Sequence, residues 1–366
     1  MRILITTDAV GGVWHYSTTL AQALADGFAI QVLLVVCGPR PTEEQITALS
    51  CGPRTNGGSN DLDYIDMPLE WEGAEEKAYV AGRQALLQLA LNWRAHILHA
   101  NEHHLGQIGA SGLPVLVVSH SDVCSWNAAM ERDAIAAVDA AYMLRVITGL
   151  SSASLVVAPS TSVVESLSTW FGYRDVVRVI PNGVRPTAAG LAPARTIDAI
   201  MVGRLWDPAK NLACFQEAVA GWTPGAFVAV GPLAPPGQRA AVTKDGTIHY
   251  PGQLPNGEVR ALFARAHILV APARYEPFGL AAVEAALAGC CLVLNDIPSY
   301  RAIWENTAVY FHADEPRTLR TTLRALLDDP DRRHALATRA RRRAESRYTA
   351  DRMARAYLAT YQRLAL

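Results

Sequence analysis

The stretch at residues 271–298, with the apolar run that leads into it, constrains the fold more than any other part of the chain, because apolar runs alternate in it with polar loops. The run at 267–272 is short and rich in β-branched residues, as in a buried parallel strand. After a loop, Gly279 opens an alanine-rich segment that Gly289 closes, and 290–295 is a second apolar run. The pattern predicts a strand, loop, helix and strand, and in such units ligands bind at the carboxyl ends of the strands.

Two carboxylates lie in this stretch, Glu276 in the loop and Glu284 in the helix. Glu284 follows Gly279 by five residues, which places it roughly 7.5 Å from the helix N-terminus. A phosphate held at that N-terminus would leave Glu284 within reach of an attached ribose. The alternative is an exposed helix face, although the neighbours of Glu284 are mostly apolar and a carboxylate on a buried helix needs a partner. On these facts alone both readings stay open.

This block resembles the signature of the retaining, metal-independent glycosyltransferases of family 4, which have the two-domain GT-B fold. In that family two glutamates separated by seven residues form the nucleotide-sugar site, with Pro-Phe-Gly-Leu after the first. The residues that match without a gap are Glu276, Pro277, Phe278, Gly279, Leu280 and Glu284. The resemblance implies that Glu284 holds ribose hydroxyls, and that Glu276 holds the sugar together with the backbone at 278–279.

Composition limits the class of protein. A chain of 366 residues, 50% of them hydrophobic, suits two domains that each bury a core. The formal net charge of −1 argues against a nucleic-acid partner, for which a basic excess is expected. No apolar run approaches the roughly 18 residues of a membrane span, and the chain opens on an apolar strand, so we expect no signal peptide. Six cysteines without a CxxC pair indicate reduced thiols and a cytoplasmic protein.

The first half of the chain alternates expected strands and helices. Strands are predicted at 2–7, 28–37, 97–100, 115–119, 155–159 and 177–180, and helices at 16–24 and 74–94. A loop at 7–14 contains Gly11 and Gly12, whose backbone N–H groups could approach an anion closely. In the family this loop closes over the donor diphosphate and the acceptor, which implies contacts from Gly11, Gly12 and Val13.

Polar or aromatic residues lie beside several of these runs. His120 directly follows the strand at 115–119, where α/β enzymes keep substrate groups. In the family a histidine here contacts the donor sugar or the acceptor hydroxyl, and a capping role is the alternative. Residues 101–104, Asn-Glu-His-His, could line the substrate, form a solvated turn or hold a metal, although the spacing disfavours zinc. Trp71, after a polar loop at 51–60, is either an acceptor contact, as the family implies, or a core residue.

A second series of strands begins after 185–195, which is rich in proline and alanine and is predicted to be an interdomain linker. The first loop of this series, 203–211, carries Arg204 and Lys210. Two cations at the carboxyl end of a strand suit a diphosphate leaving group, because they offset the charge that develops as the glycosidic bond breaks. The family has its diphosphate-binding arginine and lysine here, and solvated loop cations are the alternative.

The remaining segments extend the pattern. Further strands are predicted at 197–202, 226–231 and 309–312, and helices at 315–327 and 350–366. The loop at 250–254, which includes Leu254, resembles the one whose backbone touches the nucleotide base in the family. The arginine-rich run at 339–343 predicts a solvated helix face, with contact to anionic lipid as a weaker alternative. The last helix is amphipathic and has the size of the GT-B helix that crosses back to the first domain.

The sequence therefore predicts an α/β fold with two Rossmann-like domains facing across a cleft. Residues 1–184 with 349–366 would bind the acceptor, and 196–348 the nucleotide sugar. The resemblance implies retaining transfer from a UDP-, GDP- or ADP-sugar to a glycan or lipid-linked hydroxyl, without metal. Arg204 and Lys210 would stabilise the diphosphate, and Glu276 and His120 complete the expected catalytic set. A nucleotide-sugar epimerase and a non-catalytic nucleotide-sugar or glycan-binding protein are the alternatives, and peripheral membrane contact stays open.

Overall fold

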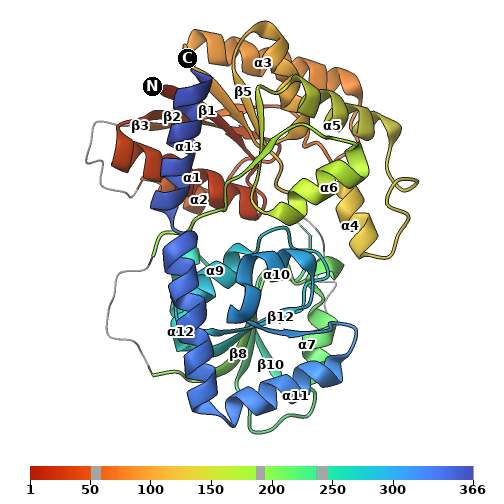
Figure 1. Ribbon diagram of the computed structural model, residues 1–366, viewed down its shortest axis with the longest axis vertical. Coiled ribbons are helices and arrows are strands. Elements are labelled where there is room, and N and C mark those ends of the chain that lie inside the picture. The colour runs from red at the N-terminus through yellow and green to blue at the C-terminus, as the bar shows by residue number, and fades with distance from the viewer. Residues whose placement is uncertain (51–58, 187–193, 236–237, 239–245, 366) are drawn as a thin grey trace. The chain divides into compact units, whose positions relative to one another are not determined.

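The computed structural model describes residues 1–50, 59–186, 194–235, 238 and 246–365. The chain forms two compact units (Figure 1). Unit 1 comprises residues 1–128, 132–185 and 350–366, and unit 2 comprises residues 129–131 and 186–349. Most of the predicted linker at 185–195 and of the predicted loop at 51–60 lies outside the described residues.

Unit 1, as far as it is described, is built on a seven-stranded parallel sheet in the order β3-β2-β1-β4-β5-β6-β7. The strands are β1 (Arg2–Thr7), β2 (Gln31–Cys37), β3 (Ser59–Ile65), β4 (Ile97–Ala100), β5 (Val115–Val118), β6 (Leu155–Ala158) and β7 (Val177–Val179). The strand order reverses between β1 and β4. The loops after these two strands therefore lie at a topological switch point, where open α/β sheets bind ligands.

Helices cover both faces of this sheet. They are α1 (Gly12–Phe28), α2 (Glu43–Ser50), α3 (Glu76–Asn92), the 3-10 helix η1 (His103–Ser111), α4 (Val123–Ala129), α5 (Ala140–Ser152), α6 (Thr161–Phe171) and the C-terminal α13 (Ala350–Leu364). α13 packs against α1, and its Tyr357 and Tyr361 join the buried cluster that contains Ile3 and Ile5 of β1. The last helix therefore returns to unit 1, as predicted.

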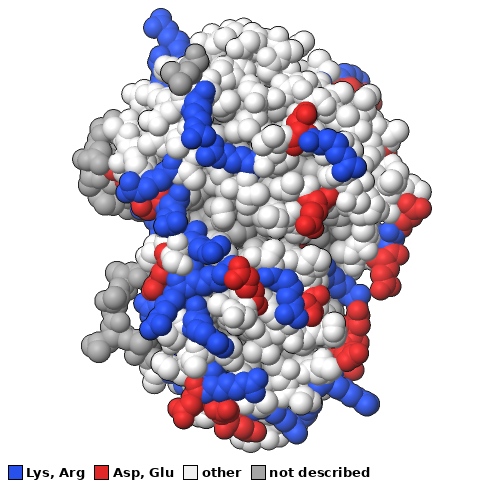
Figure 2. Space-filling model, viewed as in Figure 1, with Lys and Arg blue, Asp and Glu red and all other residues white. Residues whose placement is uncertain are grey.

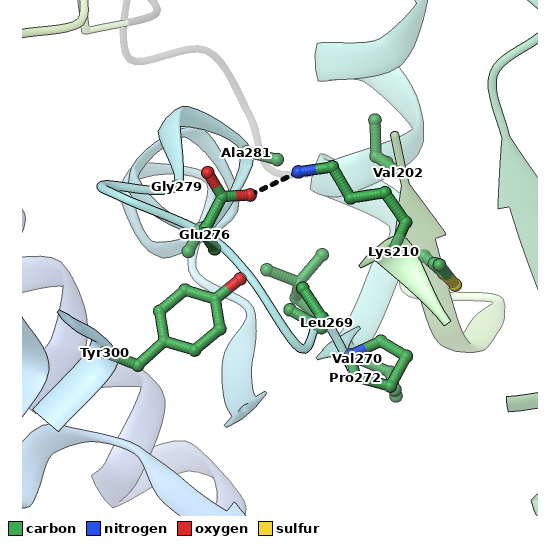
Figure 3. A pocket seen from close by; sticks show the side chains of 13 residues that line it. Val202, Lys210, Leu269, Val270, Pro272, Glu276, Gly279, Ala281 and Tyr300 are labelled. Atoms are coloured by element: carbon green, nitrogen blue, oxygen red, sulfur yellow. Dashed lines mark hydrogen bonds and ion pairs between the residues drawn. The ribbon is translucent and has the colours of Figure 1, made fainter. Parts of the chain in front are cut away.

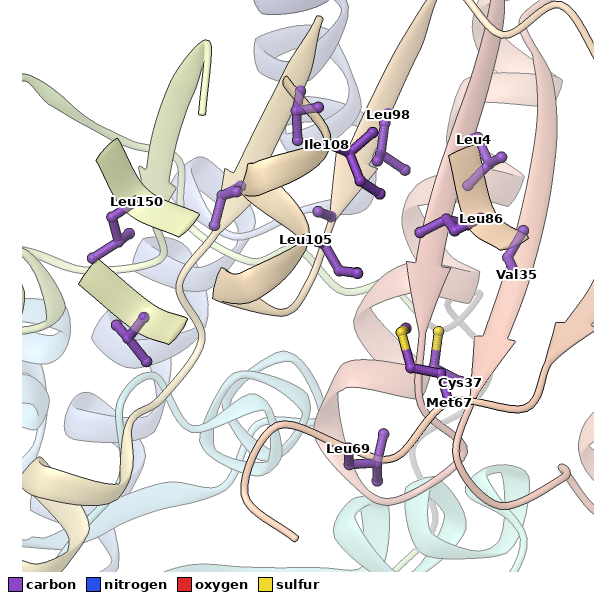
Figure 4. Packing of buried hydrophobic residues seen from close by; sticks show 14 of the residues in the cluster. Leu4, Val35, Cys37, Met67, Leu69, Leu86, Leu98, Leu105, Ile108 and Leu150 are labelled. Carbon is purple, nitrogen blue, oxygen red and sulfur yellow. The ribbon is translucent and has the colours of Figure 1, made fainter. Parts of the chain in front are cut away.

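The opposite face of the sheet has a core of its own, shown in Figure 4. Leu4 of β1 lies on this face with Leu86 of α3 and Leu105 of η1, whereas Ile3 and Ile5 lie on the other face. Successive residues of a strand point to opposite faces, so both are buried when both faces are covered. This explains why the central strands read as continuous apolar runs in the sequence.

Unit 2, where described, has a second parallel sheet of six strands in the order β10-β9-β8-β11-β12-β13. The strands are β8 (Ile197–Val202), β9 (Phe227–Val230), β10 (Ile248–Gly252), β11 (Ala266–Ala271), β12 (Cys291–Asn295) and β13 (Val309–Phe311). The helices are η2 (Pro208–Lys210), α7 (Leu212–Val219), α8 (Asn256–Arg265), α9 (Leu280–Leu287), α10 (Pro298–Trp304), η3 (Glu305–Thr307), α11 (Pro316–Leu327) and α12 (Pro330–Arg347). Here the order reverses between β8 and β11, so the loops after these strands share a switch point.

The structure differs from the local predictions at several places, one of them the strand predicted at 28–37, which begins only at Gln31 because α1 extends to Phe28. α1 begins at Gly12 rather than at residue 16, because Gly11 has φ 83° and ψ −136°, a conformation open mainly to glycine, and ends the loop there. β3 was not predicted, because Asp61 and Asp63 make it polar; it lies at the sheet edge, where charged residues are common. Residues 250–252, expected in a loop, form the end of β10, where the pairing register shifts.

The arginine-rich run lies on α12, and Figure 2 shows basic side chains gathered over this helix. Arg339, Arg341 and Arg342 are exposed, as predicted. Arg343 is an exception, because its side chain is only 10% exposed and pairs with Glu305 at 2.6 Å. No helix in the described part of the chain is both long enough and apolar enough to cross a membrane.

Candidate functional site

Two loops come together at the carboxyl edge of the unit 2 sheet, one after β8 and one after β11. The backbone N–H of Arg274 donates to the carbonyl of Ala209 at 2.8 Å, which ties the two loops together. Asp207 shapes the first loop, since its Oδ1 accepts a hydrogen bond from the N–H of Ala209 at 2.9 Å. Lys210 and Glu276, 66 residues apart in the sequence, are thereby brought side by side.

Lys210 and Glu276 form an ion pair, with 2.6 Å between Nζ and Oε2 (Figure 3). Their side chains are 19% and 20% exposed, so the pair is shielded but still open to solvent. Gly279 and Tyr300 line the same pocket. Burial raises the pKa of Tyr300 well above its usual value, and the charge of Glu276 raises it further. The Tyr300 hydroxyl therefore stays protonated beside the ion pair.

Gly279 precedes α9 as its N-cap, with a left-handed φ of 85°. A Cβ atom at this position would lie 3.0 Å from the ring of Tyr300 and 3.3 Å from Cγ of Glu276. Both the backbone angle and the close neighbours therefore require glycine here. The N–H groups in the first turn of a helix have no partner within the helix, so this N-terminus can hold an anion beside Lys210.

Glu284 lies farther along α9. Its side chain is 10% exposed, and its Oε1 lies 3.6 Å from a guanidinium nitrogen of Arg260 on α8. Glu284 therefore does not lie on an exposed helix face, and Arg260 is a charged partner for its carboxylate. Arg260 was not singled out from the sequence, because an arginine on a polar helix gives no sign of which carboxylate it meets in space.

Arg204 lies in the same loop as Lys210 and is held by Asp207, with 2.8 Å between the guanidinium and Oδ2. The Arg204 side chain is 42% exposed and that of Asp207 only 5% exposed. The buried carboxylate thus orients a cation that reaches solvent. Sequence reasoning missed Asp207, although its position directly before Pro208 is typical of the start of a helical turn.

Three further residues of unit 2 were predicted to serve the site, Phe278, Leu280 and Leu254. Phe278 is buried, and its ring packs edge-on against Tyr348 with 5.6 Å between centroids. Its side chain is thus part of the core, which agrees with the expectation that its backbone serves the site. Leu280 is the first residue of α9, and Leu254 is half-buried in the segment between β10 and α8.

In unit 1, polar residues gather where β4 and β5 end. His120 follows β5, and its Nε2 lies 2.8 Å from Oδ1 of Asn101, which follows β4. The ring of Tyr16 packs edge-on against His120 with 4.5 Å between centroids. Burial lowers the pKa of His120 to about 3, with a smaller effect of the same sign from His103. The capping role weighed for His120 belongs to Asp122, whose Oδ1 accepts from the N–H of Ser125 at 2.7 Å.

The glycine loop of unit 1 is shorter than predicted. Gly11 and Gly12 are exposed at the start of α1, and Val13 is half-buried in its first turn. Before them, Oδ1 of Asp8 accepts a hydrogen bond from the N–H of Val10 at 2.6 Å, which folds the loop back on itself. Gly11, Gly12 and Val13 therefore present the N-terminus of a helix, the type of backbone group that binds anions.

Residues 101–104 do not form a solvated turn, because His103 and His104 are buried. Nδ1 of His103 lies 2.6 Å from Oε2 of Glu70, and its Nε2 lies 2.9 Å from Oγ of Ser119. Nε2 of His104 lies 3.0 Å from Oε2 of Glu102. Each of the two imidazoles therefore contacts a carboxylate. Within the described ranges, no group of three or more His, Cys, Asp or Glu residues is placed to hold a metal ion.

The Glu70–His103 pair is charged. Burial alone would raise the pKa of Glu70, but the imidazolium of His103 lowers it to about 2. Burial would lower the pKa of His103, but Glu70 raises it above its usual value. The segment that carries Glu70 is fixed from inside by this pair, while the next residue, Trp71, is 52% exposed. Trp71 is therefore not a core residue, and acceptor contact remains a prediction for it.

Comparisons with known proteins match each unit of the chain to a glycosyltransferase family. Residues 10–188 match the family model Glycosyltransferase Family 4, and residues 238–343 match Glycosyl transferases group 1. The second match contains Glu276 and Glu284 and begins after Arg204 and Lys210. Over 102 residues the chain is 40% identical to glycogen synthase of two Mycobacterium tuberculosis strains, CDC 1551 and H37Rv. That match covers 27% of this chain and 24% of each relative.

Solved structures resemble the whole chain. Sucrose-phosphate synthase from Thermosynechococcus elongatus matches with a TM-score of 0.79 and 17% identity, over 100% of this chain and 99% of the other. HepE of Anabaena, in complex with UDP-glucose, matches with a TM-score of 0.76 and 17% identity, over 99% and 100% of the two chains. The predicted fold class is confirmed by these likenesses. With a glycosyltransferase model matched in each unit, the chain belongs to the glycosyltransferases of family 4 and group 1, which have the GT-B fold.

Proposed function

We propose that this protein transfers a sugar from a nucleoside-diphosphate sugar to a hydroxyl acceptor, with retention of the anomeric configuration and without a metal. The observation that supports this best is the Lys210–Glu276 pair in one pocket with Gly279 at the N-terminus of α9. A cation and a helix N-terminus suit a diphosphate, and Glu284 in the same helix can accept hydrogen bonds from ribose hydroxyls. The pocket and the helix that begins at it thus offer groups for the diphosphate, the sugar and the ribose of such a donor.

Lys210 and Glu276 neutralise each other in this structure. In our proposal a diphosphate draws the Lys210 ammonium to its oxygens, and Glu276 then accepts hydrogen bonds from hydroxyls of the sugar. Arg204 adds a second positive charge from the same loop. Both cations offset the negative charge that grows on the diphosphate as the glycosidic bond breaks, which is the role a metal ion fills in other transferases.

The acceptor would be a carbohydrate or a lipid-linked glycan, and unit 1 would bind it. Trp71 is exposed directly after Glu70, which is buried and paired with His103, and aromatic rings of this kind pack well against sugars. His120 and the segment of Gly11, Gly12 and Val13 are the further contacts proposed for the substrates. We place the protein in the cytoplasm, with peripheral contact to the inner face of the membrane for the case of a lipid-linked acceptor.

The direct test is product formation from UDP-, GDP- and ADP-glucose with a panel of glycan acceptors, with and without EDTA. UDP-glucose comes first, because the related HepE structure contains it. We expect release of one nucleoside diphosphate, a product with the anomeric configuration of the donor, and full activity in EDTA. Donor binding without diphosphate release would indicate a binding protein instead. Conversion of the donor to its epimer without acceptor would indicate an epimerase.

A further inference from the structure

Asn101, at the carboxyl end of β4, uses all the polar atoms of its side chain in hydrogen bonds. Its Nδ2 donates to the backbone carbonyl of Thr6 at 2.6 Å and to Oγ of Ser17 at 3.0 Å. Its backbone N–H donates to Oγ1 of Thr6 at 3.0 Å. The remaining atom, Oδ1, lies 2.8 Å from Nε2 of His120. Asn101 is thus fixed from three sides by elements of unit 1.

These contacts determine which way the amide of Asn101 faces. A backbone carbonyl only accepts hydrogen bonds, so the atom 2.6 Å from the carbonyl of Thr6 must be the amide nitrogen. The amide oxygen therefore faces His120. Since this oxygen can only accept, Nε2 of His120 must carry the hydrogen.

The charge of the ring decides what the other nitrogen can do. The titratable groups around His120 are the phenol of Tyr16, which packs on the ring, and the imidazoles of His99 and His103, which interact with it electrostatically. Burial lowers the pKa of the His120 imidazole, and the positive charge of His103 lowers it further, to about 3. The ring is therefore neutral at physiological pH. Within the described residues, Nδ1 of His120 makes no hydrogen bond.

We propose that Asn101 is a positioning residue that holds His120 as its Nε2–H tautomer, so that Nδ1 accepts a hydrogen bond from a substrate hydroxyl. A nitrogen lone pair repels phosphate oxygens, so His120 selects for a hydroxyl and against an anion. The tautomer itself follows from unit 1 alone, whereas the identity of the hydroxyl rests on the function proposed above. A sugar hydroxyl of the donor and the attacking hydroxyl of the acceptor share this chemistry.

The tautomer can be measured in the full-length protein without any activity. Selective 15N labelling of histidine and long-range 1H–15N correlation spectra distinguish a protonated ring nitrogen from one with a lone pair, and His120→Gln assigns the signal by its disappearance. We expect a neutral ring with the proton on Nε2 from pH 8 down to about pH 5. A proton on Nδ1, or a charged ring above pH 6, would overturn the proposal.

Two variants test the role of Asn101. In Asn101→Ala the acceptor is lost, so we expect a mixture of the two tautomers. Ser17→Ala is the matched control, because it removes another partner of Asn101 but leaves the contact with His120, so its spectrum should match that of the wild type. An unchanged tautomer in Asn101→Ala would show that Asn101 does not position the ring. If Asn101→Ala does not fold, Asn101→Asp takes its place: its carboxylate keeps an acceptor toward Nε2, so the Nε2–H tautomer should be retained, and a proton on Nδ1 in this variant or in the wild type would overturn the proposal.

A binding experiment then asks which hydroxyl meets His120. It compares the affinities of wild type and Asn101→Ala for UDP and UDP-glucose, and the KM of each for an acceptor to which the wild type transfers sugar. If the hydroxyl belongs to the donor, Asn101→Ala should weaken UDP-glucose binding about two- to fivefold and leave UDP binding unchanged, because only the fraction of rings in the Nε2–H form can accept from the hydroxyl. If it belongs to the acceptor, the acceptor KM should rise by a similar factor with donor affinity unchanged. Wild-type values for both would contradict the hydroxyl contact. Failure of all transfer assays would count against the proposed function, while the tautomer would still be decided by the spectra.

Discussion

Charged side chains are paired in both units, but at very different depths. In unit 1, Glu70 and His103 are 6% and 4% exposed, and Ser119, the third member of the group, is completely buried. In unit 2, Lys210 and Glu276 are 19% and 20% exposed, and Arg204 is 42% exposed. Breaking a buried pair leaves a charge without solvent, whereas an accessible pair can exchange its partner for a ligand. The depth of a pair therefore separates charges that hold the fold from charges that can bind substrate.

The largest effect is expected from Glu70→Ala. It would leave the His103 imidazole without its buried carboxylate, and the loss of one partner from a buried pair costs about 3–5 kcal/mol. The free energy of unfolding, measured by urea denaturation, should fall by that amount. The comparison would fail if Glu70→Ala were no more destabilising than Glu276→Ala, which removes a carboxylate from the accessible pair.

The same pair should give unit 1 a characteristic pH dependence. The pKa of Glu70 is lowered from 4.5 to about 2, so its contribution to stability is present above pH 4.5 and is lost as the pH falls toward 2. The pKa of His103 is raised above 6.5, so its contribution is present below 6.5 and is lost as the pH rises through the raised value. The difference in Tm between the wild type and Glu70→Gln should thus be greatest between about pH 4.5 and 6.5. A pH-independent difference would contradict a charged pair.

In unit 2 the expected effect is on catalysis instead of stability. Lys210→Ala removes a positive charge from the proposed diphosphate site and should lower kcat roughly 10²-fold, as the loss of one group that stabilises developing charge does. The free energy of unfolding should change by about 1 kcal/mol or less, because the pair is accessible. Lys77→Ala is the matched control, since Lys77 pairs with Glu75 on an exposed surface. Near-normal turnover of Lys210→Ala would remove this lysine from the mechanism.

A smaller effect is expected from Glu284, which binds ligand in our proposal without meeting the reacting atoms. Glu284→Gln keeps the size of the side chain but weakens its hydrogen bonds to ribose, so the affinity for UDP should fall roughly tenfold. Isothermal titration with UDP measures this directly. Arg260→Ala serves as the companion variant, because it removes the cation 3.6 Å from Glu284 and leaves the carboxylate in place. Equal UDP affinity in Glu284→Gln and the wild type would contradict a ribose contact.

The sequence predicted the centre of unit 2 because local features define it. The apolar runs around Glu276, the glycine at 279 and the helix with Glu284 follow one another within a short stretch, and the structure has β11, α9 and β12 at these places. Arg204 and Lys210 were singled out for the same reason, since they lie in the loop that follows β8. Signals of this kind depend on neighbours in the chain.

The features that the sequence did not predict depend on partners far along the chain. Glu70 and His103 are separated by 33 residues, and nothing in the spacing of either indicates that they meet in the core. The amide of Asn101 is oriented by Thr6, 95 residues away. β3 was missed for a different reason, because an edge strand can be polar and so lacks the apolar run by which strands are recognised. Pairing in space, rather than residue type, decides these cases.

The smallest expected effect concerns two arginines of α12 that the sequence places in one run. Arg343 is 10% exposed and makes two hydrogen bonds to the Glu305 carboxylate and one to the carbonyl of Ile303. Arg341 is 52% exposed and pairs only with Glu345, one turn along the helix. We expect Arg343→Ala to lower the free energy of unfolding by about 1–2 kcal/mol, because it removes charge-assisted hydrogen bonds. Arg341→Ala should lower it by less than about 0.5 kcal/mol.

Urea denaturation of the two alanine variants tests whether depth sets this difference, and Arg343→Lys tests whether the guanidinium geometry or the charge alone is responsible. Lysine keeps the positive charge but lacks the planar guanidinium that contacts both carboxylate oxygens of Glu305 and the carbonyl of Ile303 at once. If geometry at depth is decisive, Arg343→Lys should resemble Arg343→Ala. If Arg343→Lys is as stable as the wild type, charge alone suffices. The contribution of Arg343 would then come from its charge at this depth and not from the geometry of its guanidinium.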